Sequence, residues 1–362
     1  MGILSEAFKQ HPVENKYISP IDFNSIKNVP ESHAWVDTSD SKNPNNNNNI
    51  IKQELLLTSS IPLIDLNDPN IIDKIYNACK NWGFLQIINH GVSNEIVEKL
   101  ETQVMKLFNL PYEEKMKVLR SPESAAGYGS PRISPFFPKK MWAEGFTILA
   151  NSLFHHAKLL WPQNDDDDFR GFCDVMEEYQ AQMKALSDKL LALILKSLNI
   201  PESEMTWIND DPKNLSTALQ LNSYPKCPNP ASTMGLAQHT DSFLFTILHQ
   251  SGSVSGLQVY KDGPEWVSVD PIPGALVVNS GDLLHIISNG RFPSVVHRAI
   301  VNNEVHRISV AYFYGPPLGF RVSPYVGYPN CDGPKYKGFT IQEYVGIKSK
   351  LLESALSSIR IN

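Results

Sequence analysis

From residue 216 onward, short runs rich in β-branched and aromatic residues recur every 8 to 15 residues, and Gly, Pro, Asn or Asp separates them. Runs of this length and punctuation are typical of strands joined by tight turns. We expect eight strands, at residues 216–221, 243–249, 257–260, 266–269, 275–278, 283–287, 295–301 and 307–314. Eight such strands predict an antiparallel jelly roll, the double-stranded β-helix.

The sequence before this region has helical spacing instead. Apolar residues recur three and four apart over 71–82, again after Ser93, and over a long stretch that begins after the aspartates at 165–168. Each stretch predicts an amphipathic helix. Two short apolar runs, at 61–66 and 84–88, predict strands between these helices.

The predicted fold has mixed α and β structure: a jelly-roll core, a helix-rich N-terminal region and a C-terminal helix. The last helix is expected near 340–359, because Thr340 and Glu343 match a capping box. The Asn-rich start has little apolar surface to bury and is expected to be loosely structured. The predicted division is 1–57 (loosely structured), 58–200 (helix-rich), 201–318 (jelly roll) and 319–362 (tail and helix).

Composition excludes several classes of protein. The 362 residues carry 32 basic and 38 acidic side chains, a net charge of −6, without a cluster of Lys or Arg. We therefore expect no nucleic-acid partner and no membrane partner. The apolar run at 190–195 is too short to span a bilayer, and the first residues lack the features of a secretory signal. Four cysteines without a CxxC pair indicate reduced thiols, so we expect a cytoplasmic protein.

Three side chains have the composition of a metal site. His239 and Asp241 are two residues apart, so both point to one face of an extended segment. His297 follows in a predicted strand that can cross opposite them in a jelly roll. Two imidazoles and one carboxylate leave three coordination positions open, which is the facial triad of non-haem Fe(II) oxygenases. A bare His-x-Asp is a weak signal, and its strength comes from the polar residues that accompany it.

A second polar set follows the same spacing. Arg307 and Ser309 share one face of a predicted strand. A guanidinium inside a barrel is costly unless it meets a carboxylate, so this pair predicts a clamp for a dicarboxylate. Asn222 and Tyr224 place an amide and a phenol on one face of another strand, where both can hydrogen-bond an anion.

These motifs, in this order along the chain, resemble the 2-oxoglutarate- and Fe(II)-dependent dioxygenases. The phrases Trp82-Gly83-Phe84 and Asn89-His90-Gly91 resemble the plant branch of that superfamily. Other phrases resemble the gibberellin 3-beta-dioxygenases more narrowly, and they lie at residues 29–35, 127–129, 132–134, 136–137, 141–142, 144–147 and 160–162. The resemblance runs from about residue 20 to the last residues of the sequence.

The resemblance implies an iron site made of His239, Asp241 and His297. It implies a 2-oxoglutarate site made of Arg307, Ser309, Tyr224 and Asn222. The three metal ligands and Arg307 are the expected catalytic residues. The implied cofactors are Fe(II), 2-oxoglutarate and O2, with ascorbate as reductant. The implied reaction is 3-beta-hydroxylation of a C19-gibberellin, a diterpenoid acid, by a monomeric enzyme that releases succinate and CO2.

A gibberellin is a rigid, mostly apolar skeleton with one free carboxylate, so its site needs apolar walls and a cation. The candidate walls are Phe136, Phe137, Trp142 and Phe313, and the candidate cation is Arg132. In related flavonoid enzymes a carboxylate follows two positions after the residue that corresponds to Phe313. Gly315 stands there instead, which disfavours a flavonoid substrate.

Three alternatives remain open at this point. A sister plant dioxygenase, either a gibberellin 2-beta-hydroxylase or a flavonoid-type oxidase, would share the triad and the clamp. A small-acid binding module could lose Asp241 or Arg307 without consequence, yet this chain has both. A zinc hydrolase accepts two His and one carboxylate but has no use for a buried Arg-x-Ser clamp.

Overall fold

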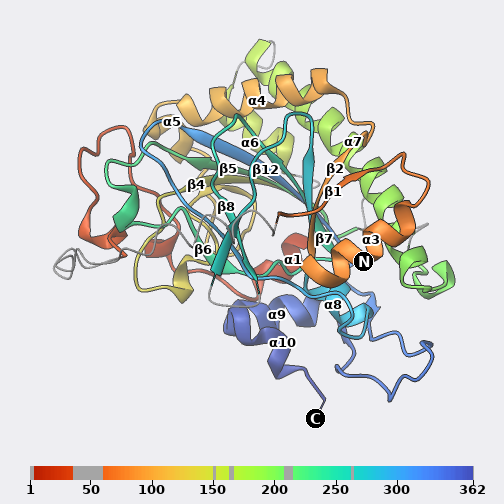
Figure 1. Cartoon of the computed structure of the whole chain (residues 1–362). Helices are drawn as coiled ribbons and strands as arrows, with labels where there is room; N and C mark the ends of the chain where they lie inside the picture. The colour runs from red at the N-terminus through yellow and green to blue at the C-terminus, as the bar shows by residue number, and fades with distance from the viewer. Residues whose placement is uncertain are drawn as a thin grey trace, which may run out of the picture.

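Two sheets form the centre of the molecule (Figure 1). The computed structural model describes residues 4–35, 60–149, 152–162, 167–207, 215–261 and 265–361. The strands are β1 (Leu63–Asp65), β2 (Phe84–Ile88), β3 (Gly127–Gly129), β4 (Glu144–Leu149), β5 (Ala218–Tyr224), β6 (Leu236–His239), β7 (Phe245–Gln250), β8 (Leu257–Lys261), β9 (Glu265–Ser268), β10 (Leu276–Ser280), β11 (His297–Ala299), β12 (Arg307–Tyr314), β13 (Arg321–Val322) and β14 (Phe339–Thr340).

The larger sheet has the strand order β1-β2-β10-β7-β12-β5-β4-β3, and the smaller has the order β6-β11-β8-β9. Within the larger sheet β12 lies between β5 and β7 and is antiparallel to both. Apart from the parallel pair of β1 with β2, the pairings of both sheets in the described residues are antiparallel. The jelly-roll prediction is confirmed. Strands β1 to β4, which come from the predicted helix-rich region 58–200, add to the larger sheet.

Helices cover the larger sheet on the side that is uppermost in Figure 1. The α-helices are α1 (Leu4–Lys9), α3 (Ile71–Trp82), α4 (Asn94–Asn109), α5 (Tyr112–Met116), α6 (Leu153–Leu160), α7 (Asp167–Ser197), α8 (Asp282–Ile287), α9 (Ile341–Leu351) and α10 (Ala355–Ser358). The short 3-10 helices are η1 (Asn15–Tyr17), η2 (Glu31–His33), η4 (Ser134–Phe136), η5 (Glu202–Glu204), η7 (Pro230–Ser232) and η8 (Leu352–Ser354). Helices α3, α4 and α6 all pack against α7, whose predicted apolar stripe is buried.

Local sequence signals explain where several helices begin and end. Gly83 ends α3 in the left-handed conformation, with φ +60°, as a glycine after a helix commonly does. Thr340 and Glu343 form the predicted capping box at the start of α9. The predicted helix near 340–359 is not continuous, because Leu352 adopts φ +42° and separates α9 from the shorter η8 and α10.

The structure corrects two strand predictions. Residues 283–287 form part of α8 instead of a strand, because a short run of mostly buried apolar residues fits either structure. Its His285 is a hydrogen-bonded core residue, in contact with the Phe292 carbonyl and the Tyr336 hydroxyl. Strand β6 was not predicted, because its four residues do not form an apolar run.

In the segment 1–57, which is predicted to be loosely structured, residues 4–35 include α1, η1 and η2, and residues 1–3 and 36–57 lie outside the described part of the chain. Leu4 and Ala7 of α1 are buried, and α1 packs against α9. Leu4 and Ala7 belong to the main hydrophobic core of the molecule, so this segment is held by packing against the rest of the chain. The remaining boundaries of the four-part division stay predictions.

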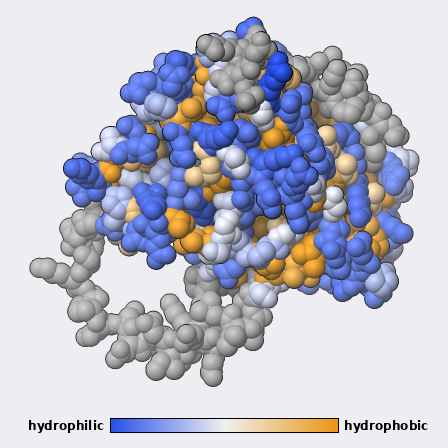
Figure 2. Space-filling view, turned by 90° about the horizontal axis from the view of Figure 1, so that it is seen from above, coloured by the Kyte–Doolittle hydropathy of each residue, from blue (hydrophilic) through white to orange (hydrophobic). Residues whose placement is uncertain are grey.

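None of the described helices is long and apolar enough to cross a membrane. In Figure 2 the face seen from above is mainly hydrophilic, with hydrophobic residues in separate patches between the charged ones.

A buried ionic network connects β3, β4 and β5 to α5. Lys115 Nζ lies 2.8 Å from Glu144 Oε2, with both side chains almost fully buried. Tyr128 donates its hydroxyl hydrogen to the same carboxylate, and Ser223 donates to its other oxygen at 3.2 Å. Ser223 lies directly opposite Glu144 in the β4–β5 register. The network therefore fixes β5 at the residue between the candidate site residues Asn222 and Tyr224.

We expect Glu144→Gln to lower the free energy of unfolding by about 3–5 kcal/mol, because the Lys115 ammonium would stay buried without its counter-charge. Urea denaturation of the purified protein measures this change. Glu95→Gln is the matched control, because Glu95 pairs with Lys99 on the exposed face of α4 and should cost less than about 1 kcal/mol. Similar losses in both variants would contradict the role of the buried pair.

Candidate active site

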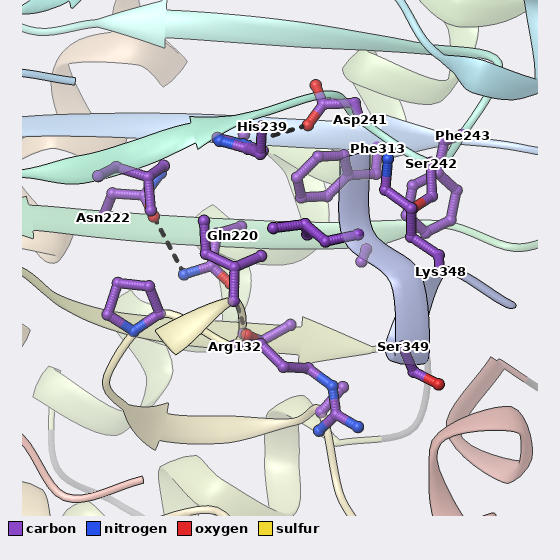
Figure 3. A pocket seen from close by; sticks show the side chains of 18 of the residues that line it. Arg132, Gln220, Asn222, His239, Asp241, Ser242, Phe243, Phe313, Lys348 and Ser349 are labelled. Atoms are coloured by element: carbon purple, nitrogen blue, oxygen red, sulfur yellow. Dashed lines mark hydrogen bonds and ion pairs between the residues drawn. The ribbon is translucent and has the colours of Figure 1, made fainter. Parts of the chain in front are cut away.

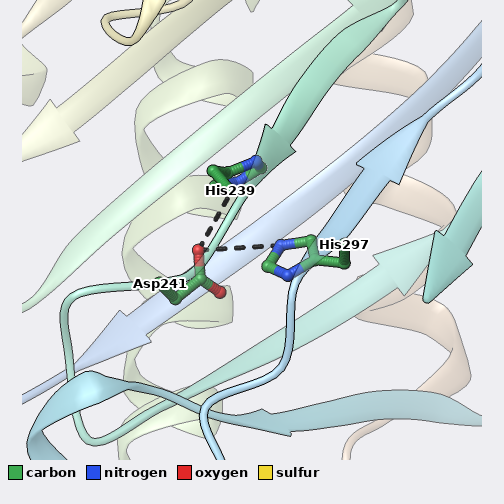
Figure 4. Close-up of side chains that lie close together, drawn as sticks. All are labelled: His239, Asp241 and His297. Carbon is green, nitrogen blue, oxygen red and sulfur yellow. Dashed lines mark ion pairs between the residues drawn. The ribbon is translucent and has the colours of Figure 1, made fainter. Parts of the chain in front are cut away.

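The three predicted metal ligands converge at the end of the smaller sheet (Figure 4). His239 ends β6, and His297 begins β11 as its direct cross-strand partner. Asp241 follows β6, and its Oδ1 lies 3.7 Å from His239 Nε2 and 3.8 Å from His297 Nε2. One ligand atom from each residue lies within 4.8 Å of the others, so the three could hold one metal ion.

Hydrogen bonds aim these ligand atoms at a common point. Nδ1 of His239 contacts the Ala237 carbonyl at 2.8 Å, and Nδ1 of His297 contacts the Val295 carbonyl at 3.1 Å. A carbonyl only accepts, so each Nδ1 carries the proton and each Nε2 presents a lone pair. This is the arrangement that metal-ligating histidines need.

The carboxylate is oriented in the same way. Asp241 Oδ2 accepts hydrogen bonds from Thr246 Oγ1 at 2.6 Å and from Asn279 Nδ2 at 2.8 Å. Its other oxygen, Oδ1, is the one that faces both histidines. Asn279 lies on β10 and Thr246 on β7, so the larger sheet orients a ligand of the smaller one.

Burial and mutual contact shift the pKa values of His239 and Asp241. Burial, reinforced by the neighbouring His297, lowers the pKa of His239 to about 4. Burial alone would raise the pKa of Asp241, but both histidines and the bonds from Thr246 and Asn279 lower it. The site thus offers neutral imidazole and anionic carboxylate, the forms that bind a divalent metal.

Lys348 is a residue near this site that the sequence reasoning missed. Its Nζ lies 2.5 Å from Oγ1 of Thr240, the residue between His239 and Asp241 in the sequence. The same Nζ lies 2.7 Å from Asp282 Oδ2. Asp282 also donates its backbone N–H to the Asp241 carbonyl at 2.8 Å. Helix α9 is thereby attached to the ligand loop. No local pattern marks Lys348, because its partners lie far away in the sequence.

The predicted clamp is assembled by the register of β12. Arg307 lies opposite Tyr224, and Ser309 lies opposite Asn222 on one side and Gln250 on the other. Asn222 Nδ2 donates to Ser309 Oγ at 3.4 Å. Arg307 donates from Nη2 to Gln250 Oε1 at 2.7 Å, and its guanidinium lies 5.2 Å from the centre of the Tyr224 ring.

The remaining donors of Arg307 have no protein partner. Its Nε and Nη1 are buried and make no hydrogen bond in the described structure. A Cβ on Gly256 would lie 2.8 Å from Nε, so only glycine leaves room for this guanidinium. Burial lowers the pKa of Arg307, although the nearby Tyr224 opposes the change. A buried cation with unpaired donors fits a bound carboxylate.

Metal triad and clamp open into one cavity of about 590 Å³ (Figure 3). Phe313 lines it as predicted and stacks on Phe243, with ring centres 5.2 Å apart. Phe136 and Arg132 also line it, and in Figure 3 Arg132 lies at the end away from His239 and Asp241. Gln220, between these ends, accepts from Thr147 at 2.5 Å.

Two predicted wall residues are placed elsewhere. Trp142 is fully buried outside the cavity and donates its indole N–H to the Pro225 carbonyl at 3.1 Å. Phe137 packs against Trp35, with ring centres 5.6 Å apart, and does not line the cavity among the described residues. In their place the structure supplies Leu4 and Phe8 of α1, which the sequence reasoning treated as loosely structured.

Arg132 has other partners in this structure. Its guanidinium donates to the carbonyls of Ser124 and His11, both at 2.9 Å, and lies 4.4 Å from the centre of the Phe8 ring. The residue therefore fastens the N-terminal segment to the cavity wall.

Two family models match the sequence. The model of the 2OG-Fe(II) oxygenase superfamily matches residues 216–316, which hold the triad and the clamp. The model described as non-haem dioxygenase in morphine synthesis N-terminal matches residues 61–188.

Similar proteins extend over nearly the whole chain. Gibberellin 3-beta-dioxygenase 1 of Pisum sativum is 45% identical over 100% of this chain and 94% of its own length. Gibberellin 3-beta-dioxygenase 3 of Arabidopsis thaliana is 41% identical over 99% of this chain and 100% of its own. The crystal structure of JOX2 in complex with 2OG, Fe and JA has a TM-score of 0.77 and 28% identity, covering 93% of this chain and 95% of that one.

Asp241→Ala should abolish metal binding, because it removes the anionic ligand and leaves two imidazoles. We expect the affinity for Fe(II), titrated anaerobically by calorimetry, to fall at least about a hundredfold. The melting temperature of the metal-free protein should change little. Retention of wild-type affinity would refute the triad.

Proposed function

Because the chain belongs to the 2OG-Fe(II) oxygenase superfamily, and within it to the family of the gibberellin 3-beta-dioxygenases, we propose that it hydroxylates a C19-gibberellin at the 3-beta position. One observation carries the site assignment. Three ligand atoms facing one point and a buried arginine with unpaired donors open into the same cavity. A metal and a dicarboxylate can therefore bind side by side in it.

In this proposal His239, Asp241 and His297 hold Fe(II), with the two Nε2 atoms and Asp241 Oδ1 as donors. Bound together, Fe(II), 2-oxoglutarate and O2 supply the oxidant that replaces a C–H bond by C–OH, with release of succinate and CO2. The residues of the chain hold these partners in place. Thr246 and Asn279 keep Asp241 oriented through their hydrogen bonds to its other oxygen.

The clamp holds the far carboxylate of 2-oxoglutarate. Arg307 provides the charge and two unpaired donors, and Ser309 provides a hydroxyl. Nη2 of Arg307 donates a hydrogen bond to Gln250, whereas Nε and Nη1 have no partner in the described structure. Tyr224 and Asn222 line the same part of the cavity and complete the polar surroundings.

The other end of the cavity fits a rigid apolar acid. Phe313, Phe243 and Phe136 supply apolar wall, and the cation Arg132 lies at the end away from His239 and Asp241. A Cβ on Gly315 would lie 3.1 Å from the Phe243 ring, so a larger residue there would press on the Phe243–Phe313 stack. The lack of space for a carboxylate side chain at Gly315, such as related flavonoid enzymes have there, supports a gibberellin as the substrate over a flavonoid.

We further infer a cytoplasmic monomer with ascorbate as reductant and no nucleic-acid partner. The four cysteines are free, which agrees with a reducing compartment. All described residues of the triad, clamp and cavity come from one chain, so a second copy is not required to complete the site.

Arg307→Lys should weaken the binding of 2-oxoglutarate selectively, because a point charge cannot reproduce the planar, bidentate geometry of a guanidinium. We expect the KM for 2-oxoglutarate to rise at least about tenfold, and the KM for gibberellin to stay within about threefold. Steady-state assays that vary one substrate at a time measure both. An unchanged KM for 2-oxoglutarate would show that the anion binds elsewhere.

Incubation with Fe(II), 2-oxoglutarate, ascorbate and a C19-gibberellin that lacks the 3-beta-hydroxyl should give one 3-beta-hydroxylated product with equimolar succinate. Mass spectrometry against authentic standards identifies the product. Exclusive 2-beta-hydroxylation, or efficient oxidation of a flavonoid instead, would assign the chain to a sister dioxygenase. Gibberellin binding without succinate release would favour a binding module.

A further inference from the structure

Besides Arg307, a second buried arginine of the cavity wall has a donor without a hydrogen-bond partner in the described structure. Arg120 lies between α5 and β3 and is 6% exposed. Its backbone N–H donates to the Tyr128 carbonyl at 2.9 Å, and the N–H of Tyr128 donates to the Val118 carbonyl at 2.9 Å. These bonds hold the segment alongside β3. The side chain borders both the catalytic cavity and a neighbouring cavity of about 430 Å³.

The Gly127-Tyr128-Gly129 motif explains how this segment fits. A Cβ on Gly129 would lie 3.3 Å from Arg120 Cζ, so a larger residue would press on the guanidinium. A Cβ on Gly127, which has φ +107°, would lie 2.7 Å from the Val118 carbonyl oxygen. Both glycines allow β3 to run close to the segment that carries Arg120.

The guanidinium lacks a counter-charge. Arg120 donates from Nη2 to the Ser130 carbonyl, and its buried Nε has no partner. No hydrogen bond or ion pair joins it to a carboxylate in the part of the chain that the structure describes. Among the described cavity-lining residues, Arg307 is the other one with buried donors left unpaired.

The surroundings increase this imbalance. Burial, with the positive charge of Arg132, lowers the pKa of Arg120 to about 9, and burial lowers that of Arg132 to about 10. Both side chains are therefore cations at neutral pH. The described acidic residues that line the cavity are Glu14, which pairs with Lys16 at 2.8 Å, and the metal ligand Asp241. The cavity thus has buried positive charge in excess.

Other cavity cations already have partners or are exposed. Arg298 donates to Gln258 at 2.8 Å and lies over the Trp266 ring, and Lys348 pairs with Asp282. Lys350 is an exposed residue at the rim. A buried cation that lacks an anion is unfavourable until an anion enters. Since Arg307 is assigned to 2-oxoglutarate, Arg120 is the remaining buried arginine of the described cavity wall with an unpaired donor for a second carboxylate.

We propose that Arg120 is the specificity residue that makes the enzyme select substrates with a free carboxylate. The proposal rests on the function assigned above and adds a residue to it. Arg120 supplies the charge that the carboxylate of the substrate meets, and Arg132 holds the N-terminal segment beside it.

The test compares a gibberellin with its methyl ester, which has the same skeleton without the charge. The wild-type enzyme should prefer the acid, and Arg120→Gln should lower kcat/KM for the acid roughly a hundredfold, mainly through KM. In this variant, kcat/KM for the ester and the KM for 2-oxoglutarate should stay within about threefold of the wild-type values. Lys350→Gln, the matched control, should leave the preference for the acid largely intact.

Arg120→Lys provides a variant that keeps the charge, and it should keep most of the preference for the acid. Turnover of 2-oxoglutarate without gibberellin verifies that each variant has folded with an intact metal site. An unchanged acid-to-ester ratio in Arg120→Gln, or an equal loss in Arg120→Lys, would overturn the role of Arg120 alone. Failure of the wild-type enzyme to oxidise any gibberellin would overturn the proposed function instead.

Discussion

Strand β12 is hydrogen-bonded along both edges, to β5 and to β7, and this two-sided pairing determines where the polar groups of the cavity lie. The register places Arg307 and Ser309 opposite Tyr224 and Asn222. A shift by one residue would turn every side chain of β12 to the opposite face of the sheet. On the other edge of β5, Ser223 donates a hydrogen bond to Glu144 of β4, which adds a side-chain contact to the pairing of these two strands. The position of the proposed dicarboxylate clamp therefore depends on sheet pairing as well as on the identity of its side chains.

The metal centre depends on contacts between the two sheets. The two histidines are cross-strand neighbours in the smaller sheet, whereas the partners that orient Asp241 come from the larger one. Asp282 then joins α8, α9 and the ligand loop through Lys348 and a backbone bond to Asp241. Metal geometry and sheet packing are therefore coupled.

The structure brings the predicted triad and clamp residues together, and their sequence signals could be read because they are local. His239-x-Asp241 and Arg307-x-Ser309 share the two-residue period of a strand, so their common face follows from covalent geometry. Helix α7 has an apolar stripe long enough to exclude a strand. Signals that depend on distant partners were missed. Trp142 resembles a cavity residue until its place behind the sheet is known, and Arg120 is distinguished only by the anion it lacks. Residues 283–287 show the same limit for secondary structure, because a short buried apolar run fits a helix or a strand and its pattern does not decide between them.

The contact between α1 and α9 has a consequence for how the enzyme is made. These two helices come from opposite ends of the described chain, yet they pack together and both line the cavity. Such non-local contacts form late in folding, because they require closure of a very long loop. The triad and clamp residues all precede α9 in the chain, whereas Lys348 of α9 contacts Thr240 between two of the metal ligands. A chain that has been synthesised only as far as the clamp therefore lacks one wall of the cavity, which α9 supplies afterwards.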